Sequence, residues 1–373
     1  MSYSIFCLLI DAYGSSGGVA YYNRQLLRAF STHPNVEKIT VLPRLIQDSS
    51  WGEIPSKVHF YPGASHSRVH YIWEAWKRFA QTGPNPLILC GHLNLLPLAA
   101  ALASWKKAPI YTTLFGTEAF SNYAGKSKIS HWAFGHNQGW IAISQYTLDR
   151  FKQHNPSASG PAFLLPPCID LEQFSSGSKP EELVRRYHLE NKKVILTLGR
   201  VSKQERLKGF DRVIRALPQL IQSMPNLVYM ICGGGDDHHH LMQMAKELGI
   251  DKHLILTGFV PESEKTAYYR LADAFVMPSK GEGFGIVLIE AAACGIPVIG
   301  SQADASREAL LQGKVGMLVD PDQPQDLIQK ILAALQRPVS LSSSRQTLLD
   351  QYSLARFDQT CHQILNAILV PST

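Results

Sequence analysis

Two carboxylates eight residues apart, Glu282 and Glu290, stand in the stretch "SKGEGFGIVLIE", with glycines crowded around the first. The apolar run "AFVMPS" before them predicts a strand, and "FGIVLIEAAACG" predicts a helix that ends at Gly295. Glycines let backbone N–H groups approach a ligand closely, and a helix N-terminus reached through such a loop suits a diphosphate. Glu290 would lie under two helical turns in, roughly 7–9 Å along the axis, which is about one nucleoside's reach. The spacing therefore predicts a nucleotide-sugar site, with Glu290 at the ribose and Glu282 at the sugar.

The alternative to a binding site is that Glu282 is a solvated charge on a loop and Glu290 a charge on a helix face. Glu290 is flanked by "IVLI" and "AAAC", and a carboxylate in such apolar surroundings needs a partner. We therefore favour the functional interpretation.

Cations follow another predicted strand, "KVILTLG", in the segment "GRVSKQERLKGF". Arg200 comes directly after the strand, and Lys208 precedes the glycine that opens the next helix. An Arg offers a bidentate fork and a Lys a mobile point charge, so both suit a diphosphate. If the reaction expels a nucleoside diphosphate, Arg200 and Lys208 would stabilise the charge that develops on it. Lys203 and Arg206 nearby are expected to be solvated.

A third glycine-rich loop, "DAYGSSGGVAYYN", joins the first predicted strand to an amphipathic helix. Gly17 and Gly18 would allow close approach of a ligand at the start of that helix. The spacing is not GxGxxG and no acidic residue ends a second strand, so dinucleotide binding is disfavoured.

Short apolar runs alternate with amphipathic helical patterns along the whole sequence. This alternation predicts an α/β fold of βαβ units with parallel sheets. The cycle restarts near Val194 after a polar stretch, so we predict two Rossmann-like domains with a linker near Leu171 to Ser178. The expected domains are residues 1–174 with a C-terminal helix at 354–373, and residues 175–353. Ligands in such sheets bind beyond the carboxyl ends of strands.

Composition excludes several classes of protein. Hydrophobic residues make up 45% and charged residues 18% of the 373, as in globular proteins, and no apolar run is long enough to span a membrane. Six scattered cysteines without CxxC pairs indicate reduced thiols in a cytoplasmic protein. Residues 1–170 hold 14 Lys and Arg against 8 Asp and Glu, which accounts for the whole net charge of +6. That excess suits an anionic partner such as a membrane surface or an acidic acceptor, and ordinary surface scatter is the alternative.

At these glycine-rich and charged segments together the sequence resembles the retaining GT-B glycosyltransferases of glycosyltransferase family 4. Glu282 and Glu290 match the family's Glu-x7-Glu signature, Arg200 and Lys208 its phosphate-binding pair, and Gly17 with Gly18 its N-terminal loop. The resemblance covers nearly the whole chain and is strongest from Val194 to Pro321.

The resemblance implies a fold and a set of donor contacts. It implies a GT-B fold, with an acceptor-binding first domain and a nucleotide-sugar-binding second domain. The loop around Val260 would bind the nucleobase. Backbone amides would meet the sugar and the phosphates at Gly283, Phe284, Gly285 and Ile286. No metal and no cofactor is expected, and the triplet His238-His239-His240 lacks the spacing of a metal site.

Two departures from the family pattern stand out. The His of a common His-Gly pair is replaced by Phe115 in "YTTLFGTEAF", so a mechanism that requires an imidazole there is in doubt. Glu118 or His92 are the candidates for polar contacts on the sugar and acceptor side, and His92 is equally well explained as a buried histidine bonded to backbone. The stretch "SQADASREAL" lacks the glycine pair that often precedes the residue matching Glu308.

The expected function is transfer of a hexosyl unit from a nucleoside-diphosphate sugar to a hydroxyl group of a glycan or lipid-linked acceptor. UDP-glucose is the favoured donor and GDP-mannose the second, and no nucleic-acid partner is expected. The alternatives are a nucleotide-sugar epimerase and an inactive nucleotide-sugar-binding subunit.

The helix predicted at 67–81 leaves two interpretations of its apolar side. Val69, Ile72, Trp73, Trp76 and Phe79 share one side, flanked by basic residues. We expect this side to face the core. The alternative is an interfacial helix that meets a membrane, which would place the protein at the inner face of that membrane.

Overall fold

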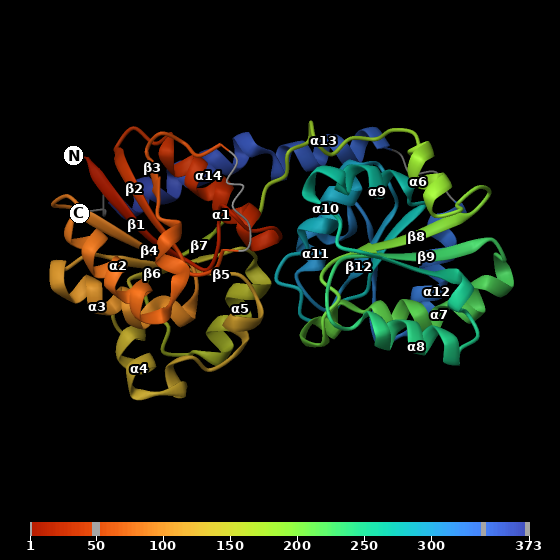
Figure 1. The fold of residues 1–373 in the computed structure, drawn as a ribbon, viewed down its shortest axis with the longest axis horizontal. Helices are drawn as coiled ribbons and strands as arrows, with labels where there is room; N and C mark the ends of the chain where they lie inside the picture. Colours follow the sequence, from red (N-terminus) through yellow and green to blue (C-terminus); the bar gives the residue numbers. More distant parts are fainter. Residues whose placement is uncertain (1, 47–52, 337–340, 370–373) are drawn as a thin grey trace. The chain divides into compact units, whose positions relative to one another are not determined.

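Parallel strands alternate with helices throughout this computed structural model, which describes residues 2–46, 53–336 and 341–369. The chain forms two units, Met1–Cys168 with Leu354–Thr373, and Ile169–Ser353 (Figure 1). Residues 370–373, which close the predicted first domain, lie outside the described part.

The first unit ends at Cys168, whereas the sequence suggests residue 174. The difference arises because the next residues are bonded to the second unit's own helices. The N–H of Ile169 donates to the carbonyl of Tyr352 at 2.9 Å, and the guanidinium of Arg345 donates to the carbonyl of Leu171 at 2.6 Å.

The first unit contains a seven-stranded parallel sheet in the order β3-β2-β1-β4-β5-β6-β7. Five strands fall on the apolar runs that predict them, because continuous apolar residues suit strands covered on both faces. The two edge strands, β3 and β7, are only three residues long and were not predicted. The strands are β1 Tyr3–Leu9, β2 Val36–Pro43, β3 Val58–Phe60, β4 Pro86–Cys90, β5 Ile110–Leu114, β6 Gly139–Ala142 and β7 Ala162–Leu164.

Helices cover both faces of this sheet. They are α1 Gly18–Ser31, α2 Arg68–Ala80, α3 Leu96–Lys106, α4 Lys128–Phe134, α5 Gln145–His154 and α14 Leu354–Leu369. Parallel crossovers are right-handed, so α2 to α5 share one face and α1 lies on the other. The C-terminal α14 packs on α1, where Arg28 and Asp358 form an ion pair at 2.7 Å. Serines cap α2, α4 and α5 by accepting an N–H at their N-termini.

The apolar side of α2 faces solvent, so the expectation of a core-facing side is wrong. Val69 is 80% and Trp73 53% exposed, and of the five apolar residues named above only Phe79 is buried. The helix carries a second stripe, which includes Tyr71 and Phe79, and this stripe packs on the sheet. Tyr71, Ala75 and Phe79 of this stripe lie in the core of the first unit, and the hydroxyl of Tyr71 keeps a partner there by donating to the carbonyl of Leu42 at 3.1 Å.

The second unit contains a six-stranded parallel sheet in the order β10-β9-β8-β11-β12-β13. All six strands coincide with predicted apolar runs. They are β8 Lys193–Leu198, β9 Leu227–Cys232, β10 Leu254–Gly258, β11 Ala274–Met277, β12 Val298–Ser301 and β13 Met317–Val319.

The second unit's helices pack around this sheet and fill its core. They are α6 Glu181–Arg186, α7 Phe210–Ser223, α8 His238–Glu247, α9 Lys265–Leu271, α10 Ile286–Ala293, α11 Ser306–Ala309, α12 Pro324–Gln336 and α13 Leu341–Tyr352. Two short 3-10 helices, η5 Lys203–Lys208 and η7 Glu262–Glu264, carry charged residues near the sheet's carboxyl edge.

Each sheet has one point where the strand order reverses. In the first unit β1 and β4 are neighbours, and in the second unit β8 and β11 are neighbours. Loops that leave the carboxyl ends of such a strand pair border the usual ligand crevice of open α/β sheets. The glycine-rich loops singled out in the sequence follow β1 and β11, and Arg200 follows β8.

Candidate active site

The loops after β8 and β11 bring Lys208 and Glu282 together. The ammonium nitrogen Nζ of Lys208 lies 3.1 Å from Oε2 of Glu282 and 3.4 Å from Oε2 of Glu205. Gly199 leaves room for the lysine stem, since a Cβ there would come within 3.1 Å of the Lys208 Cδ. Two residues 74 positions apart in the chain are thus paired at the sheet's switch point.

The charge of Lys208 is secured by its neighbours. Burial by itself lowers the pKa of this lysine, but the charges and hydrogen bonds of Glu282 and Glu205 outweigh burial and hold its pKa above the ordinary value. Lys208 is therefore fully protonated at neutral pH and presents a positive charge at the edge of the sheet.

Arg200 lies in the same group but is far more open to solvent. Its side chain is 72% exposed, and its Nε lies 3.2 Å from Oε1 of Glu205. Glu205 thus holds both cations that the sequence analysis selected. Sequence reasoning missed Glu205, whose only signal was a lone acidic residue among the basic ones of η5.

The glycines after β11 shape the start of α10. Gly281 has φ 109° and Gly285 has φ 87°, values that side chains rarely adopt. Gly285 is the N-cap, and no side chain caps the first amides of α10, which leaves them suited to an anion. Phe284 is buried against Tyr352, with ring centroids 5.5 Å apart, so only its backbone could face a ligand. Ile286 begins the helix and Gly283 is buried.

A buried aspartate that sequence reasoning missed braces this loop. Asp304 is 3% exposed, and its Oδ2 accepts hydrogen bonds from the N–H groups of Gly281 at 3.1 Å and Glu282 at 2.9 Å. The same oxygen accepts from the hydroxyl of Ser279 at 2.7 Å. Burial raises the pKa of the Asp304 carboxyl, and these hydrogen bonds oppose the rise. Asp304 stands in "SQADASREAL", where the sequence lacks the glycine pair noted above.

Replacing Asp304 by alanine is expected to lower the free energy of unfolding by about 3 kcal/mol, because it strands several buried donors. Asp304→Asn keeps an acceptor oxygen and should lose less. Urea unfolding of both variants, with the exposed Asp251→Ala as the matched control, measures the effect. Equal stability of the Asp304→Ala and Asp251→Ala variants would show that the brace is dispensable.

Glu290 lies on α10 and is 2% exposed. Its Oε2 accepts a hydrogen bond from the hydroxyl of Tyr269 at 2.6 Å, and its Oε1 lies 3.6 Å from Nζ of Lys265. The lysine is itself buried and lies 2.6 Å from Oε1 of Glu262. Burial raises the pKa of Glu290, and the charge of Lys265 opposes that shift. The sequence analysis expected a partner for Glu290 because its neighbours in the chain are apolar. That partner is Lys265, which the sequence analysis did not single out. Val260, in the preceding loop, is buried.

In the first unit, Gly17 is the N-cap of α1 with φ 108°, and Gly18 begins the helix. A Cβ on Gly17 would meet nothing within 4 Å, so its backbone conformation, and not crowding, calls for glycine. As at α10, no side chain caps the helix.

Glu118 and His92 of the first unit both bond to nearby backbone. Oε1 of Glu118 accepts from the N–H groups of Phe115 at 2.7 Å and Gly116 at 3.2 Å. Nδ1 of His92 accepts from the N–H of Asn94 at 3.0 Å. Burial lowers the pKa of His92, and the charge of Glu118 opposes that shift. Phe115, in place of the family's histidine, packs its ring on Tyr22.

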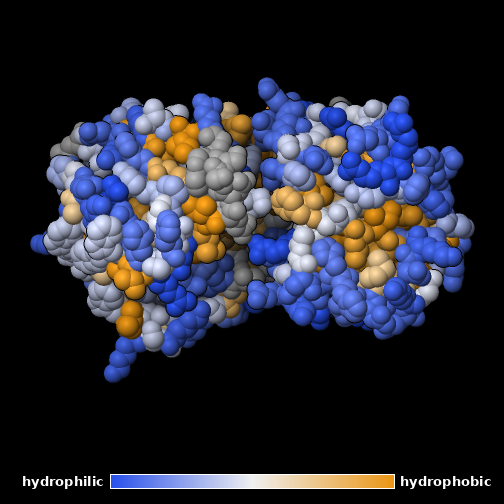
Figure 2. All heavy atoms as spheres, in the orientation of Figure 1, coloured by the Kyte–Doolittle hydropathy of each residue, from blue (hydrophilic) through white to orange (hydrophobic). Residues whose placement is uncertain are grey.

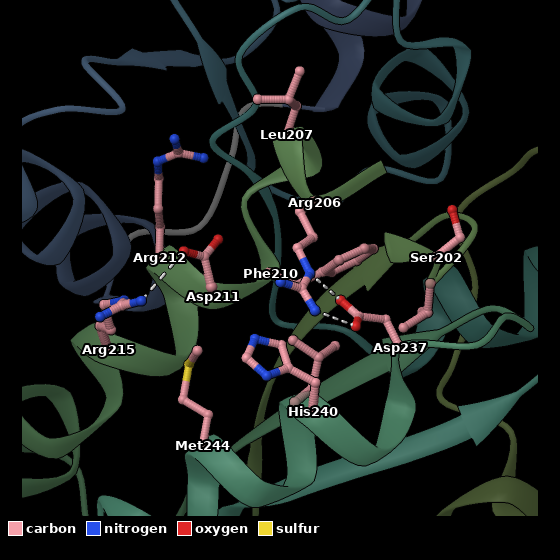
Figure 3. A pocket seen from close by; sticks show the side chains of 12 residues that line it. Ser202, Arg206, Leu207, Phe210, Asp211, Arg212, Arg215, Asp237, His240 and Met244 are labelled. Atoms are coloured by element: carbon pink, nitrogen blue, oxygen red, sulfur yellow. Dashed lines mark hydrogen bonds and ion pairs between the residues drawn. The ribbon is translucent and has the colours of Figure 1, made fainter. Parts of the chain in front are cut away.

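A cavity of about 410 Å³ lies between η5, α7 and α8 (Figure 3). Arg206 enters it and makes a bidentate ion pair with the buried Asp237, at 2.7 and 2.8 Å. The hydrogen bond from Arg206 lowers the pKa of Asp237. Neither Lys208 nor Glu282 lines the cavity. The guanidinium of Arg206 is engaged in its ion pair with Asp237.

Other groups named from the sequence have structural partners. His238 bonds to the carbonyls of Gly233 and Gly235, and across residues 2–46, 53–336 and 341–369 no three His, Cys, Asp or Glu side chains form a metal-binding group. All six cysteines are buried and free, as predicted. None of the helices in the described part of the chain is long and apolar enough to cross a bilayer.

Comparison with known proteins gives matches in sequence and in fold. Residues 179–348 match the family model described as glycosyl transferases group 1. The GDP-mannose-dependent alpha-(1-6)-phosphatidylinositol monomannoside mannosyltransferase of Mycolicibacterium smegmatis is 32% identical over 249 residues, which are 57% of this chain. The match spans 63% of that relative's length.

Two solved structures resemble the whole chain. The sucrose-phosphate synthase of Thermosynechococcus elongatus has a TM-score of 0.75 and 18% identity over 99% of this chain and all of its own. HepE of Anabaena in complex with UDP-glucose has a TM-score of 0.73 and 18% identity over 98% of this chain and 99% of its own.

Proposed function

Because residues 179–348 match the family model of the group 1 glycosyl transferases, we propose that this chain moves a hexosyl unit from a nucleoside-diphosphate sugar to a hydroxyl group, with retention of configuration. The likeness to solved structures confirms the predicted GT-B fold of two Rossmann-like domains.

The observation that carries the proposal is the Lys208–Glu282 pair at the carboxyl ends of β8 and β11. In the proposed complex the Lys208 ammonium and the Arg200 guanidinium face the diphosphate, and Glu282 accepts hydrogen bonds from the sugar's hydroxyls. The uncapped amides at the start of α10 would meet the phosphates, and Glu290 would bind the ribose. Gly17 and Gly18 stay as proposed donor-binding residues.

We propose a front-face route for the transfer step. The bond between the anomeric carbon and the diphosphate oxygen breaks, and its electron pair stays on the leaving group. The acceptor hydroxyl attacks from the same face, and its proton passes to the departing diphosphate. Arg200 and Lys208 stabilise the developing charge, so no metal is required and positioning with electrostatics supplies most of the rate.

The choice of donor rests on the relatives. The mannosyltransferase of Mycolicibacterium smegmatis is named as GDP-mannose-dependent and is 32% identical, whereas HepE, solved with UDP-glucose, is 18% identical. We therefore place GDP-mannose ahead of UDP-glucose, the reverse of the order that the sequence alone favours. The same relative is named for phosphatidylinositol monomannoside, which supports a lipid-linked acceptor. His92 and Glu118 stay as candidates on the acceptor side.

A thermal-shift screen tests the donor. GDP-mannose is expected to stabilise the protein by about 2.7 kcal/mol at a hundred times its Kd, and UDP-glucose by less. EDTA should change neither the shift nor the transfer rate. The variant Glu290→Gln should shrink the shift, while Asp251→Ala should leave it intact.

Product analysis separates the competing functions. Transfer to an added acceptor supports the proposal, and an epimerised donor without acceptor would replace it with epimerase activity. Donor binding without transfer or hydrolysis would identify an inactive binding subunit. A shift with UDP-glucose that exceeds the GDP-mannose shift would reverse the order of donors.

A further inference from the structure

The outward side of the helical layer α2 to α4 in the first unit is rich in exposed aromatic and aliphatic residues. Four of the chain's six tryptophans lie there, although the same helices bury other residues in the core. We call this surface the tryptophan face. Its members are Val69, Ile72, Trp73, Trp76, Trp105, Ile129 and Trp132, which are 37% to 80% exposed.

Contacts link the tryptophan face across helices. The rings of Trp76 on α2 and Trp105 on α3 lie 5.7 Å apart. The ammonium of Lys77 lies 4.5 Å from the centre of the Trp73 ring. Helix α4, which packs on α3, extends the surface with Ile129 and Trp132. In Figure 2 hydrophobic atoms also reach the surface in the region of α4, at the lower left, beside hydrophilic ones.

The same segment holds almost no negative charge. Residues 68–136 contain seven Lys and Arg but only two acidic residues, Glu74 and Glu118. Both carboxylates are occupied: Glu74 is buried and pairs with Arg78 at 2.9 Å, and Glu118 accepts backbone N–H groups. Lysines and arginines exposed around the face are Arg68, Lys77, Lys107, Lys126 and Lys128. Residues 68–136 therefore supply most of the first unit's net positive charge, and most of their lysines and arginines are exposed to solvent.

This combination of groups fits one kind of partner. Tryptophan combines an apolar ring with a polar N–H, which suits the level of lipid headgroups. Lysine is depleted in protein–protein interfaces, yet lysines next to exposed apolar residues are what anionic lipid surfaces attract. The exposed rings and aliphatic side chains of the tryptophan face stand on the outside of three helices, which suits shallow insertion into a lipid layer.

We infer that the tryptophan face docks the protein on an anionic lipid bilayer. The face lies on three helices, so it is wider than the single helix at 67–81 that the sequence offered. The inference rests on the proposed function in one respect: a lipid-linked acceptor would then be presented in the bilayer that the first unit touches.

Vesicle co-sedimentation of the full chain tests the docking. Vesicles of phosphatidylcholine with phosphatidylglycerol should bind the protein, and vesicles of phosphatidylcholine alone should not. Trp73→Ser with Trp105→Ser should weaken binding about tenfold. Arg68→Glu with Lys128→Glu should weaken it by about fivefold per residue and reduce its response to salt. The matched control, Leu248→Ser with Lys246→Glu, removes an exposed apolar residue and reverses a charge at the C-terminal end of α8 in the second unit, and it should bind normally.

Tryptophan emission and donor binding complete the test. A blue shift on vesicle addition, reduced in the tryptophan variant, shows insertion of these rings. All variants should keep the GDP-mannose thermal shift, so a failed donor assay would count against the transferase and leave the docking result intact. Absence of vesicle binding, or binding that the tryptophan variant retains, overturns the inference. Self-association that depends on Trp73 without vesicle binding would assign the face to a second copy of the chain.

Discussion

The Lys208→Ala variant is expected to lose about a thousandfold in transfer rate, close to 4 kcal/mol of transition-state stabilisation. The ammonium is placed 3.1 Å from Glu282, and in the proposed reaction it stabilises the leaving diphosphate at the moment the glycosidic bond breaks. The loss should appear mainly in kcat, because the interaction strengthens as charge develops. Single-turnover measurement, with the enzyme in excess over the donor and with saturating acceptor, gives the rate of the transfer step directly.

The matched control is Lys203→Ala, which removes an exposed lysine of η5 and should leave the rate unchanged. The Lys208→Ala variant leaves Glu282 and Glu205 without their shared cation, so some loss of stability is also expected and thermal unfolding must accompany the kinetics. Without Lys208 the carboxylates of Glu205 and Glu282 repel each other. The double variant Lys208→Ala with Glu205→Gln removes this repulsion without restoring the cation. If the double variant recovers full transfer, Lys208 acts through the fold and not on the leaving group.

Lys208 also sets an expectation for pH. Its pKa is raised in the folded chain, so the stability it contributes is fully present below the ordinary lysine pKa and is lost only as pH rises through the higher folded value. Between pH 6 and 9 the transfer rate is therefore expected to show no titration of Lys208.

Strand positions in the second unit were predictable because each strand is a continuous apolar run bounded by glycine, proline or charge. The same rule failed for β3 and β7 of the first unit, which are three residues long and lie at the sheet's edges. An edge strand of that length is held by its hydrogen bonds to the neighbouring strand. It is too short to show a recognisable apolar pattern in its own sequence. Similarly, α2 has two apolar stripes, and only the contacts of Tyr71 and Phe79 decide which one is buried.

Candidate site residues were predictable where chemistry follows a strand. Arg200 and Glu282 follow β8 and β11, which are neighbours in the sheet. Their positions directly after predicted strands were enough to place both at the carboxyl edge of the sheet. The supporting residues were not predictable. Asp304 and Lys265 act on groups more than twenty positions away in the chain, and Glu205 pairs with Arg200 and Lys208 of its own loop, where nothing marks it apart from a solvated charge. Their roles depend on which loops meet, and spacing alone does not encode that.

The Lys265→Met variant is expected to lose about 3–5 kcal/mol of unfolding free energy at neutral pH, as for a buried ion pair that loses one partner. The groups that face the Glu290 carboxyl are Lys265, Tyr269 and Glu262, and only the lysine is positive. Without it, burial and the charge of Glu262 act unopposed on the carboxyl of Glu290.

The sign of the pH effect follows from linkage. A carboxyl whose pKa is raised on folding binds more protons in the folded than in the unfolded chain, so its charge destabilises the fold increasingly as pH rises above its ordinary pKa. In Lys265→Met that loss should extend to higher pH than in the unsubstituted protein. Denaturant unfolding between pH 5 and 8 measures the slope, with the exposed Lys246→Met as control.

The double variant Lys265→Met with Glu290→Gln decides whether the lysine serves the glutamate. Neutralising both members removes the stranded charge, so the double variant should regain much of the stability and lose the added pH slope. Donor binding adds a second readout: if Glu290 grips the ribose as a carboxylate, Lys265→Met should bind GDP-mannose more weakly at pH 6 than at pH 8, while Lys246→Met should not. A Lys265→Met protein whose stability and donor affinity are both independent of pH would mean that Tyr269 alone holds Glu290 in its charged form.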